Sequence, residues 1–224
     1  MKGRLLKEYT DFQVDRIQFT KEIKDKHVER INEPEICNLI KVKAEDAPVV
    51  VPHSNSSKET RMELLGMVSS INSIGKKEQD KIVKKDDTDF LWRFEKYCKK
   101  NNLIFNKKFL DAIGDESSII LIKLKYKYNR PRPFQLAPAL GIELKSAHAF
   151  TANTPSFPSG HAAQSKLVAN VLSKIYPVHH DAFQAISEKI SYSRYIGGLH
   201  FPSDIEYGNR IGDWLSAHTD ISSY

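Results

Sequence analysis

Hydrophobic residues recur at helical spacing along most of the chain after residue 57. In the segment SKETRMELLGMVSSIN, Ser57 precedes an apolar run that contains Met62, Leu64, Leu65 and Val68. A serine before such a run is typical of a helix N-cap, because its side chain satisfies a backbone N–H of the first turn. The segment therefore predicts a helix that begins just after Ser57.

A second stretch, DTDFLWRFEKYCKKNN, places Phe90, Leu91, Phe94, Tyr97 and Cys98 on one helical face. Such an aromatic stripe is far more typical of a buried core than of a cofactor site. Helical spacing also predicts helices over 106–128, 161–176, 180–196 and 203–218.

Signals for strands are scarce, so the predicted fold class is all-α, a compact single-domain helical bundle. The length of 224 residues suits one domain with a sizeable core. Residues 1–59 are rich in charge and carry only short apolar clusters. We expect them to form a helical or irregular extension that packs on a core domain spanning 60–224.

The composition is that of an ordinary soluble globular protein, with 40% hydrophobic and 28% charged residues. The net charge of +6 is modest, and the lysines are mixed with acidic residues. A nucleic-acid binder would show a denser basic stripe with interleaved aromatics, so no nucleic-acid partner is expected. A mildly positive surface suits an anionic substrate.

The chain has no apolar run near the ~20 residues that would span a bilayer, so no membrane span is predicted. Glu8 and Asp11 stand where a secretory signal would need an apolar core. The two cysteines, Cys37 and Cys98, lack metal-type spacing and fit a reducing compartment. The sequence thus predicts a soluble, cytoplasmic protein.

The first motif that carries chemistry is KYKYNRPRPF, residues 125–134. Lys125 and Arg132 are seven residues apart, about two helical turns, so both cations can point to one place. The prolines on both sides of Arg132 reduce the entropy lost when it is held still. An ammonium and a planar guanidinium together suit a phosphate. Taken alone, the segment is equally typical of a solvated basic helix end.

The second motif is FPSGHAAQ, residues 157–164. Ser159 can cap the helix that follows, and Gly160 lets the backbone approach a ligand. The free N–H groups at that helix start form an anion site. His161 stands beside it, where an imidazolium could give a proton to a leaving oxygen. A serine N-cap followed by an incidental histidine is the alternative.

The third motif is SRYIGGLHFPSD, residues 193–204. A Gly-Gly pair ends the helix, so the chain can turn back and bring His200 to face Arg194 across a small site. Ser203 is expected to begin a capping box that puts Asp204 in the first turn of the last helix. The Asp204 carboxylate would then hydrogen-bond one nitrogen of His200 and leave the other free to attack. An aspartate that merely favours a helix N-terminus is the alternative.

Together, Lys-x6-Arg-Pro at 125–133, Pro-Ser-Gly-His at 158–161 and Ser-Arg-x5-His-x3-Asp at 193–204 resemble the three-part signature of the type-2 phosphatidic acid phosphatase superfamily. That superfamily includes bacterial class A nonspecific acid phosphatases and vanadium haloperoxidases. No signature position departs from the pattern. Because membrane-spanning segments are not predicted, the chain resembles the soluble acid phosphatase branch, whose fold is a helical bundle.

The resemblance implies a metal-independent acid phosphatase that hydrolyses phosphomonoesters, with diphosphates also allowed. His200 would be the nucleophile and become phosphorylated, and Asp204 would orient it. His161 would protonate the leaving alcohol and later activate water. The phosphoryl oxygens would be held by Lys125, Arg132, Ser159, Gly160 and Arg194.

Two other functions stay open at this point. The same pocket could hold vanadate as the cofactor of a haloperoxidase, whereas in a phosphatase vanadate would be an inhibitor and no cofactor is expected. A phosphate- or nucleotide-binding protein without catalysis is the second, disfavoured because simple binding needs no acid–nucleophile pair. The expected partner is a small phosphorylated substrate, and a homo-oligomer is allowed.

Overall fold

The structure is a computed structural model that describes residues 9–19, 25–32, 35 and 37–224. Its described part is helical, with an isolated antiparallel bridge between Ile40 and Thr219 and no strand, which confirms the all-α prediction. The α-helices are α1 (Asp11–Asp15), α2 (Asp25–Asn32), α3 (Lys58–Ile74), α4 (Lys76–Asp87), α5 (Trp92–Lys100), α6 (Lys107–Tyr128), α7 (Pro133–Leu136), α8 (Gly160–Ile175), α9 (His180–Ile196) and α10 (Pro202–Ala217). Short 3-10 helices lie at Ala44–Asp46, Ala137–Leu140 and Pro177–His179.

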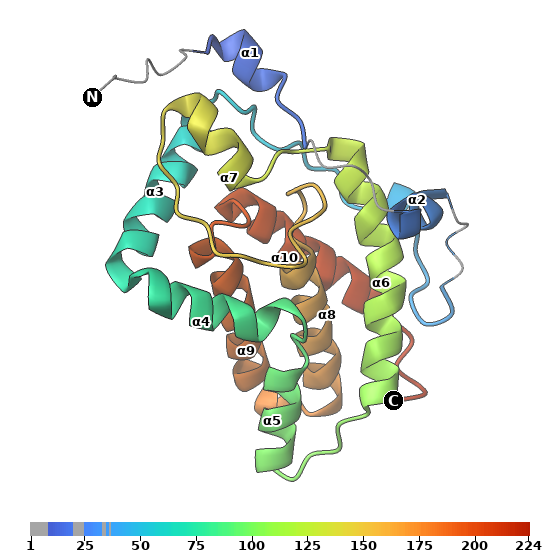
Figure 1. The fold of residues 1–224 in the computed structure, drawn as a ribbon. Helices are drawn as coiled ribbons and strands as arrows, with labels where there is room; N and C mark the ends of the chain where they lie inside the picture. The colour runs from blue at the N-terminus through green and yellow to red at the C-terminus, as the bar shows by residue number, and fades with distance from the viewer. Residues whose placement is uncertain (1–8, 20–24, 33–34, 36) are drawn as a thin grey trace.

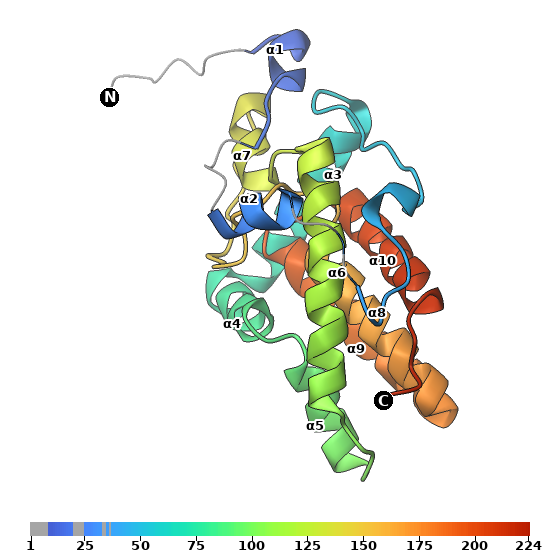
Figure 2. The same ribbon diagram turned by 90° about the vertical axis from the view of Figure 1, so that its right-hand side faces the viewer.

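The bundle is organised around α8, which packs most extensively on α9 and α10 (Figures 1 and 2). Leu167, Val168 and Leu172 of α8 are fully buried in the main hydrophobic cluster, to which α5, α6, α9 and α10 also contribute. The buried positions of α8, which include Ala162, Ser165 and Val171, are spread around the helix and are not confined to one stripe. The long helix α6 lies along one side of the bundle, and α2 packs on it.

Two glycines let α10 approach the start of α8 closely. A Cβ added at Gly208 would lie 2.6 Å from the Ser159 carbonyl oxygen, and one added at Gly212 would lie 2.5 Å from the Ala163 carbonyl oxygen. Neither position has room for a side chain, so the two helices touch through their backbones. This contact sets the position of the α8 N-terminus against the middle of α10.

The long connection between α7 and α8 has no regular structure after residue 141 and crosses the face of the bundle (Figure 1, yellow to gold). It is tied down by the N–H of Ala147, which donates to the Gly197 carbonyl at 2.8 Å. The N–H of Phe150 and the hydroxyl of Thr151 both donate to the Asp87 carboxylate. The connection is thereby held over the ends of α4 and α9.

Most predicted helix bounds agree with the structure within two residues, and Ser57 does cap α3 by accepting from the Thr60 N–H. The helical face proposed at 90–98 was partly wrong, because α5 begins only at Trp92. The carboxylate of Asp89 accepts the N–H groups of Leu91 and Trp92, which fixes the helix start after Phe90. Leu91 is nevertheless buried.

The capping box proposed at Ser203 was also wrong. The N-cap of α10 is Phe201, and Pro202 occupies the first helical position, where its missing N–H has no cost. Asp204 lies in the first turn as predicted and accepts the Phe201 N–H at 2.8 Å. Ser203 instead binds Glu63 of α3 through its N–H at 2.6 Å.

Residues before 60 contribute to the interior at several points. Val14 is buried in a small cluster with Leu64, and Ile40 is buried in the main cluster. The domain boundary at 59/60 stays a prediction. Within the described ranges, no helix combines the length and the apolar character that crossing a membrane requires.

Candidate active site

The three motifs converge where the C-terminal end of α6, the start of α8 and the α9–α10 connection meet. His200 lies in that connection and is buried. Its Nε2 lies 2.8 Å from Nη1 of Arg132. A guanidinium can only donate hydrogen bonds, so Nε2 must accept, and the ring proton of a neutral His200 is therefore on Nδ1. Burial and the nearby Arg132 charge hold the pKa of His200 well below its ordinary value, in agreement with a neutral ring.

The carboxylate of Asp204 lies behind this ring. Its Oδ2 is 3.6 Å from Nδ1 of His200, within ion-pair reach but longer than a hydrogen bond. The sequence predicted a direct hydrogen bond here. Oδ2 instead accepts from the hydroxyl of Ser156 and the N–H of Phe201, while Oδ1 is 2.6 Å from Nη1 of Arg130. The carboxylate is thus fixed by three other donors while it faces the histidine.

Asp204 is ionised although it is completely buried. Burial alone would raise the pKa of Asp204, but the Arg130 charge, the His200 side chain and the Ser156 hydroxyl together lower it below the usual range. An ionised carboxylate beside Nδ1 favours the tautomer that Arg132 requires at the other nitrogen.

Arg130 is a site residue that the sequence reasoning missed. Its buried guanidinium donates to Asp204, to the Ser203 hydroxyl at 2.9 Å and, on α3, to Glu63 at 3.4 Å. The Cζ atom of Arg130 also lies over the Phe201 ring, 4.0 Å from its centroid. The only signal was its place in the proline-flanked run that also contains Arg132.

Arg132 and Lys125 are brought together as predicted. Arg132 is buried and donates to the carbonyls of Thr154 and Leu199 at 2.8 and 2.9 Å, besides its bond to His200. Burial lowers its pKa to about 10. The Lys125 ammonium donates to the Pro155 and Pro158 carbonyls at 2.9 and 2.7 Å. Burial and the charge of Arg132 lower the pKa of Lys125.

The second motif forms the N-terminus of α8. Ser159 caps the helix and accepts the Ala162 N–H at 3.5 Å. Because the helix begins at Gly160, the N–H groups of Gly160 and His161 have no carbonyl one turn earlier to bind. A Cβ at Gly160 would make only ordinary contact with Lys125 Cε, at 3.7 Å. Glycine is therefore not required there by the space that the protein leaves.

His161 lies half-buried on the first turn of α8, with its Nε2 3.2 Å from the backbone carbonyl of Asp87. A carbonyl only accepts, so Nε2 carries a proton and Nδ1 is the nitrogen that gains or loses one. Burial and the Arg194 charge lower the pKa of His161 to about 3 in the empty site.

Arg194 is oriented by two residues of α4, Asp87 and Val83. Its Nη1 is 3.0 Å from the Asp87 carboxylate and its Nη2 donates to the Val83 carbonyl at 3.1 Å. Asp87 therefore joins Arg194, His161 and the connection between α7 and α8. The sequence reasoning missed Asp87 because it lies in a run where lysines are mixed with acidic residues and no motif marks a site.

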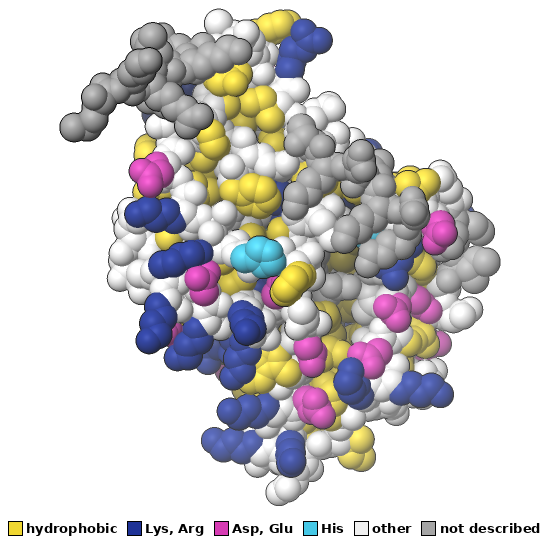
Figure 3. All heavy atoms as spheres, in the orientation of Figure 1, with side chains coloured by type: hydrophobic (Ala, Val, Ile, Leu, Met, Phe, Trp, Pro, Cys, Tyr) yellow, Lys and Arg dark blue, Asp and Glu magenta, His cyan; other side chains and the backbone are white. Residues whose placement is uncertain are grey.

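A cavity of about 430 Å³ opens beside Lys125, Gly160 and His161. The face shown in Figure 3 carries many lysine and arginine side chains over α4 and α5, which favours the approach of an anion. In the ranges that the structure describes, no three His, Cys, Asp or Glu side chains are gathered as they would be around a metal ion.

Comparison with known proteins shows that residues 114–218 match the model of the PAP2 superfamily. This matched region contains all three motifs. A non-specific acid phosphatase of Providencia stuartii is 32% identical over 101 residues, 45% of this chain and 40% of that protein. A lipid A 1-phosphatase of Rhizobium etli is 33% identical over 66 residues, 30% of this chain and 28% of that protein. The matched region thus spans two-fifths or less of these curated relatives.

Two solved structures share the fold. A bacterial vanadium-dependent iodoperoxidase superimposes with a TM-score of 0.56 at 18% identity, over 77% of this chain and 51% of that one. A transmembrane PAP2-type phosphatidylglycerolphosphate phosphatase from Bacillus subtilis superimposes with a TM-score of 0.51 at 17% identity, over 72% of this chain and 84% of that one.

Proposed function

Because residues 114–218 match the model of the PAP2 superfamily, we propose that the protein is a phosphatase that hydrolyses phosphomonoesters through a phosphohistidine on His200. The observation that carries the proposal is the state of the His200 ring. Its Nε2 lone pair is turned toward the Arg132 guanidinium at 2.8 Å, and its Nδ1 proton is turned toward the Asp204 carboxylate. A neutral imidazole in this tautomer is ready to attack an electrophile.

Binding of a substrate would place its phosphoryl group among Lys125, Arg132, Arg194 and the N–H groups at the start of α8. Arg132 would then exchange its bond to Nε2 for a bond to a phosphoryl oxygen, which frees the lone pair. Three fixed cations and helix N–H groups offset the charge that builds on the phosphoryl oxygens during transfer.

In the first step the Nε2 lone pair forms the N–P bond as the P–O bond to the leaving alcohol breaks. The positive charge that develops on the His200 ring is stabilised by the ionised Asp204. The leaving oxygen takes a proton from Nδ1 of His161. In the second step His161 removes a proton from water, and the resulting hydroxide attacks phosphorus and breaks the N–P bond, which releases phosphate.

His161 must be protonated for the first step, although its pKa is about 3 in the empty site. The Arg194 and Lys125 charges contribute to this low value after burial. A phosphate dianion bound to those cations cancels much of their charge, so binding of substrate would raise the pKa of His161 and load it with the proton that it later gives away.

The named relatives support a phosphate ester as the substrate class, since one is an acid phosphatase and the other a lipid A 1-phosphatase. Vanadate has the tetrahedral shape and charge of phosphate, and we propose that it binds the same cations as an inhibitor. Halide oxidation by peroxide that requires vanadate would instead favour the haloperoxidase alternative.

The proposal is tested by incubating the purified protein with a panel of phosphate esters and measuring release of inorganic phosphate. We expect turnover of at least one class of monoester without added metal, inhibition by vanadate, and no turnover by His200→Ala. Equal activity of the wild-type and His200→Ala proteins would refute the assignment of the nucleophile.

A further inference from the structure

The cavity beside the phosphoryl site has a second wall that comes from α2. Its lining includes Lys125, Gly160 and His161 of the phosphoryl site together with His27 and Arg30 of α2. The volume of about 430 Å³ is within the ~300–1,000 Å³ range of small-molecule sites, so the cavity holds more than a phosphoryl group. The rest of the described lining is Ser118, Leu121, Ile122, Phe150, Thr151, Asn153, Thr154 and Gln164.

This lining is cationic and contains no acidic side chain among the described residues. The neighbouring cavity over α4, of about 570 Å³, differs because Asp80 and Asp87 contribute to it. An acid-free wall with Arg30 at one end and Lys125 at the other favours a ligand with negative charge at both ends.

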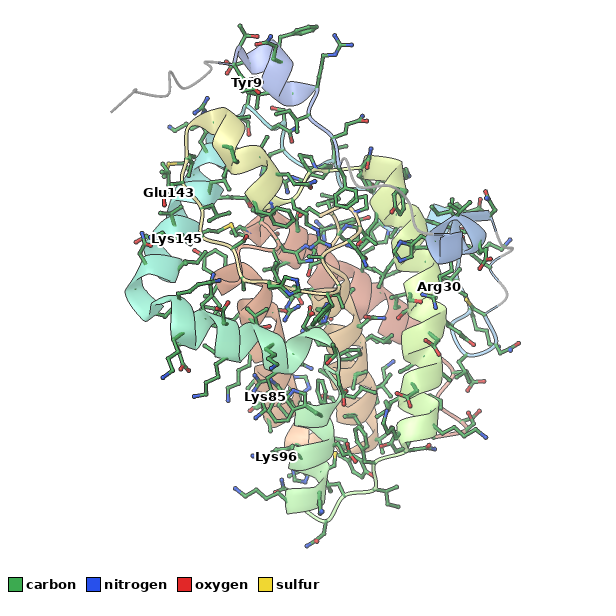
Figure 4. All side chains as sticks on the ribbon, in the orientation of Figure 1. Tyr9, Arg30, Lys85, Lys96, Glu143 and Lys145 are labelled. Atoms are coloured by element: carbon green, nitrogen blue, oxygen red, sulfur yellow. The ribbon has the colours of Figure 1, made fainter. Side chains whose placement is uncertain are left out.

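Arg30 is held at its end of the cavity by α6. Its Nη1 donates to the Ser118 hydroxyl at 2.8 Å, and Figure 4 shows the side chain between α2 and α6. Within the part of the chain that the structure describes, no carboxylate lies within ion-pair distance of Arg30. A guanidinium has five N–H donors, so the bond to Ser118 leaves others for a ligand.

The helix also sets the separation between the two ends. Ser118 and Lys125 are seven residues apart on α6, a rise of about 10 Å. Leu121 and Ile122 lie between them along the same helix, and both are nearly completely buried. The cavity thus has a cation at each end and apolar side chains in the middle.

We propose that this cavity binds the leaving group of the substrate, and that Arg30 selects leaving groups that carry a second anionic group. The substrate class is a phosphate ester with a further phosphate or carboxylate several bonds from the reacting phosphorus. The inference rests on the proposed function, since it places the reacting phosphoryl group at Lys125 and His161. Arg30 acts here as a binding residue and takes no part in the chemistry.

The test compares kcat/KM for 1,4-butanediol bisphosphate with kcat/KM for butyl phosphate, whose leaving group is uncharged. A third substrate, 4-phosphooxybutanoate, distinguishes a carboxylate from a phosphate at the second position. We expect the wild-type protein to prefer at least one doubly charged substrate over butyl phosphate by about tenfold or more, the worth of a hydrogen bond to a charge. If kcat/KM of the wild-type protein for both doubly charged substrates is no higher than for butyl phosphate, the proposal is overturned before any variant is made.

Variants at Arg30 test whether this residue causes the preference for doubly charged substrates. Arg30→Gln should lower the ratio about tenfold, while Arg30→Lys, which keeps the charge, should retain part of it. Arg61→Gln is the matched control, because it removes the same charge from an exposed site on α3, outside the cavity lining. An unchanged ratio in Arg30→Gln, or an equal fall in Arg61→Gln, would show that Arg30 does not select the substrate.

Binding of stable analogues separates this inference from the hydrolase proposal. Calorimetry would compare butane-1,4-bisphosphonate with butylphosphonate on the wild-type and Arg30→Gln proteins. A preference for the bisphosphonate that Arg30→Gln abolishes supports the subsite even in a protein that hydrolyses none of the esters. Ester hydrolysis with no preference for either phosphonate would keep the hydrolase and refute the subsite.

Discussion

At the scale of single residues, the ionised state of Asp204 depends on the charge of Arg130. The two side chains are completely or almost completely buried and 2.6 Å apart, so neither has water to replace its partner. Removing one member of a buried pair leaves the other as an uncompensated charge, which is far more costly than losing an exposed pair.

Arg130→Gln is therefore expected to lower the free energy of unfolding by about 3–5 kcal/mol. The matched exposed pair is Arg61 with Asp11, 3.9 Å apart, and Arg61→Gln should cost no more than about 1 kcal/mol. Urea unfolding at pH 7 measures both losses. Similar small losses in the two variants would mean that the Arg130–Asp204 pair is not isolated from solvent.

The close contact between α8 and α10 belongs to the scale of the element. Because the backbone of α10 touches α8 at Gly208 and Gly212, the start of α8 and the first turn of α10 hold their place relative to each other. His161 lies on the first of these elements and Asp204 on the second. Any substitution that pushes α8 and α10 apart therefore also moves the proton donor His161 away from the Asp204 carboxylate.

Gly208→Ala should thus destabilise the protein by about 1–3 kcal/mol, since the new methyl group would lie 2.6 Å from the Ser159 carbonyl. It should also lower kcat for phosphate release. Gly114→Ala on α6 is the control, because nothing lies within 4 Å of its added Cβ and alanine favours a helix. Thermal unfolding and turnover are measured on both. A loss in Gly114→Ala as large as that in Gly208→Ala would contradict the packing argument.

The helices and the motif residues were predictable because their signals are local. Apolar spacing located α8 and α9, and the turn residues around Ser159 located the start of α8. The role of Asp87 was not predictable, because a carboxylate in a lysine-rich run becomes a site residue only when Arg194 of another helix reaches it. The role of Arg130 likewise depends on the approach of α3 and α10, which no local pattern encodes.

At the scale of the whole molecule, the two site histidines link stability to pH. Burial lowers the pKa of His200 well below its ordinary value and that of His161 to about 3, whereas both take up protons near pH 6.5 in the unfolded chain. The unfolded state therefore binds more protons than the folded state below pH 6.5. The stability that the neutral rings contribute is present above pH 6.5. It is lost as the pH falls toward the pKa values of the two histidines in the folded protein.

Urea unfolding between pH 5 and pH 7 should show a free energy of unfolding that rises with pH. His161→Asn should reduce this slope by up to one proton, about 1.4 kcal/mol per pH unit, because the variant has no ring to protonate. The exposed His218 is the control, and His218→Asn should leave the slope closer to that of the wild-type protein. An identical slope in wild-type and His161→Asn proteins would contradict the neutral state of His161 in the folded protein.

In the proposed mechanism a phosphoryl group is transferred to Nε2 of His200. This transfer is tested most directly by acid-free quenching of the protein during turnover of a phosphate ester, followed by mass spectrometry of its peptides. In a His161→Ala protein the phosphorylated intermediate should accumulate, because attack of water on it is expected to slow. We expect one phosphoryl group on the peptide that contains His200 and none on the same peptide of His200→Ala. Phosphorylation at another residue, or turnover by His200→Ala at the wild-type rate, would contradict it.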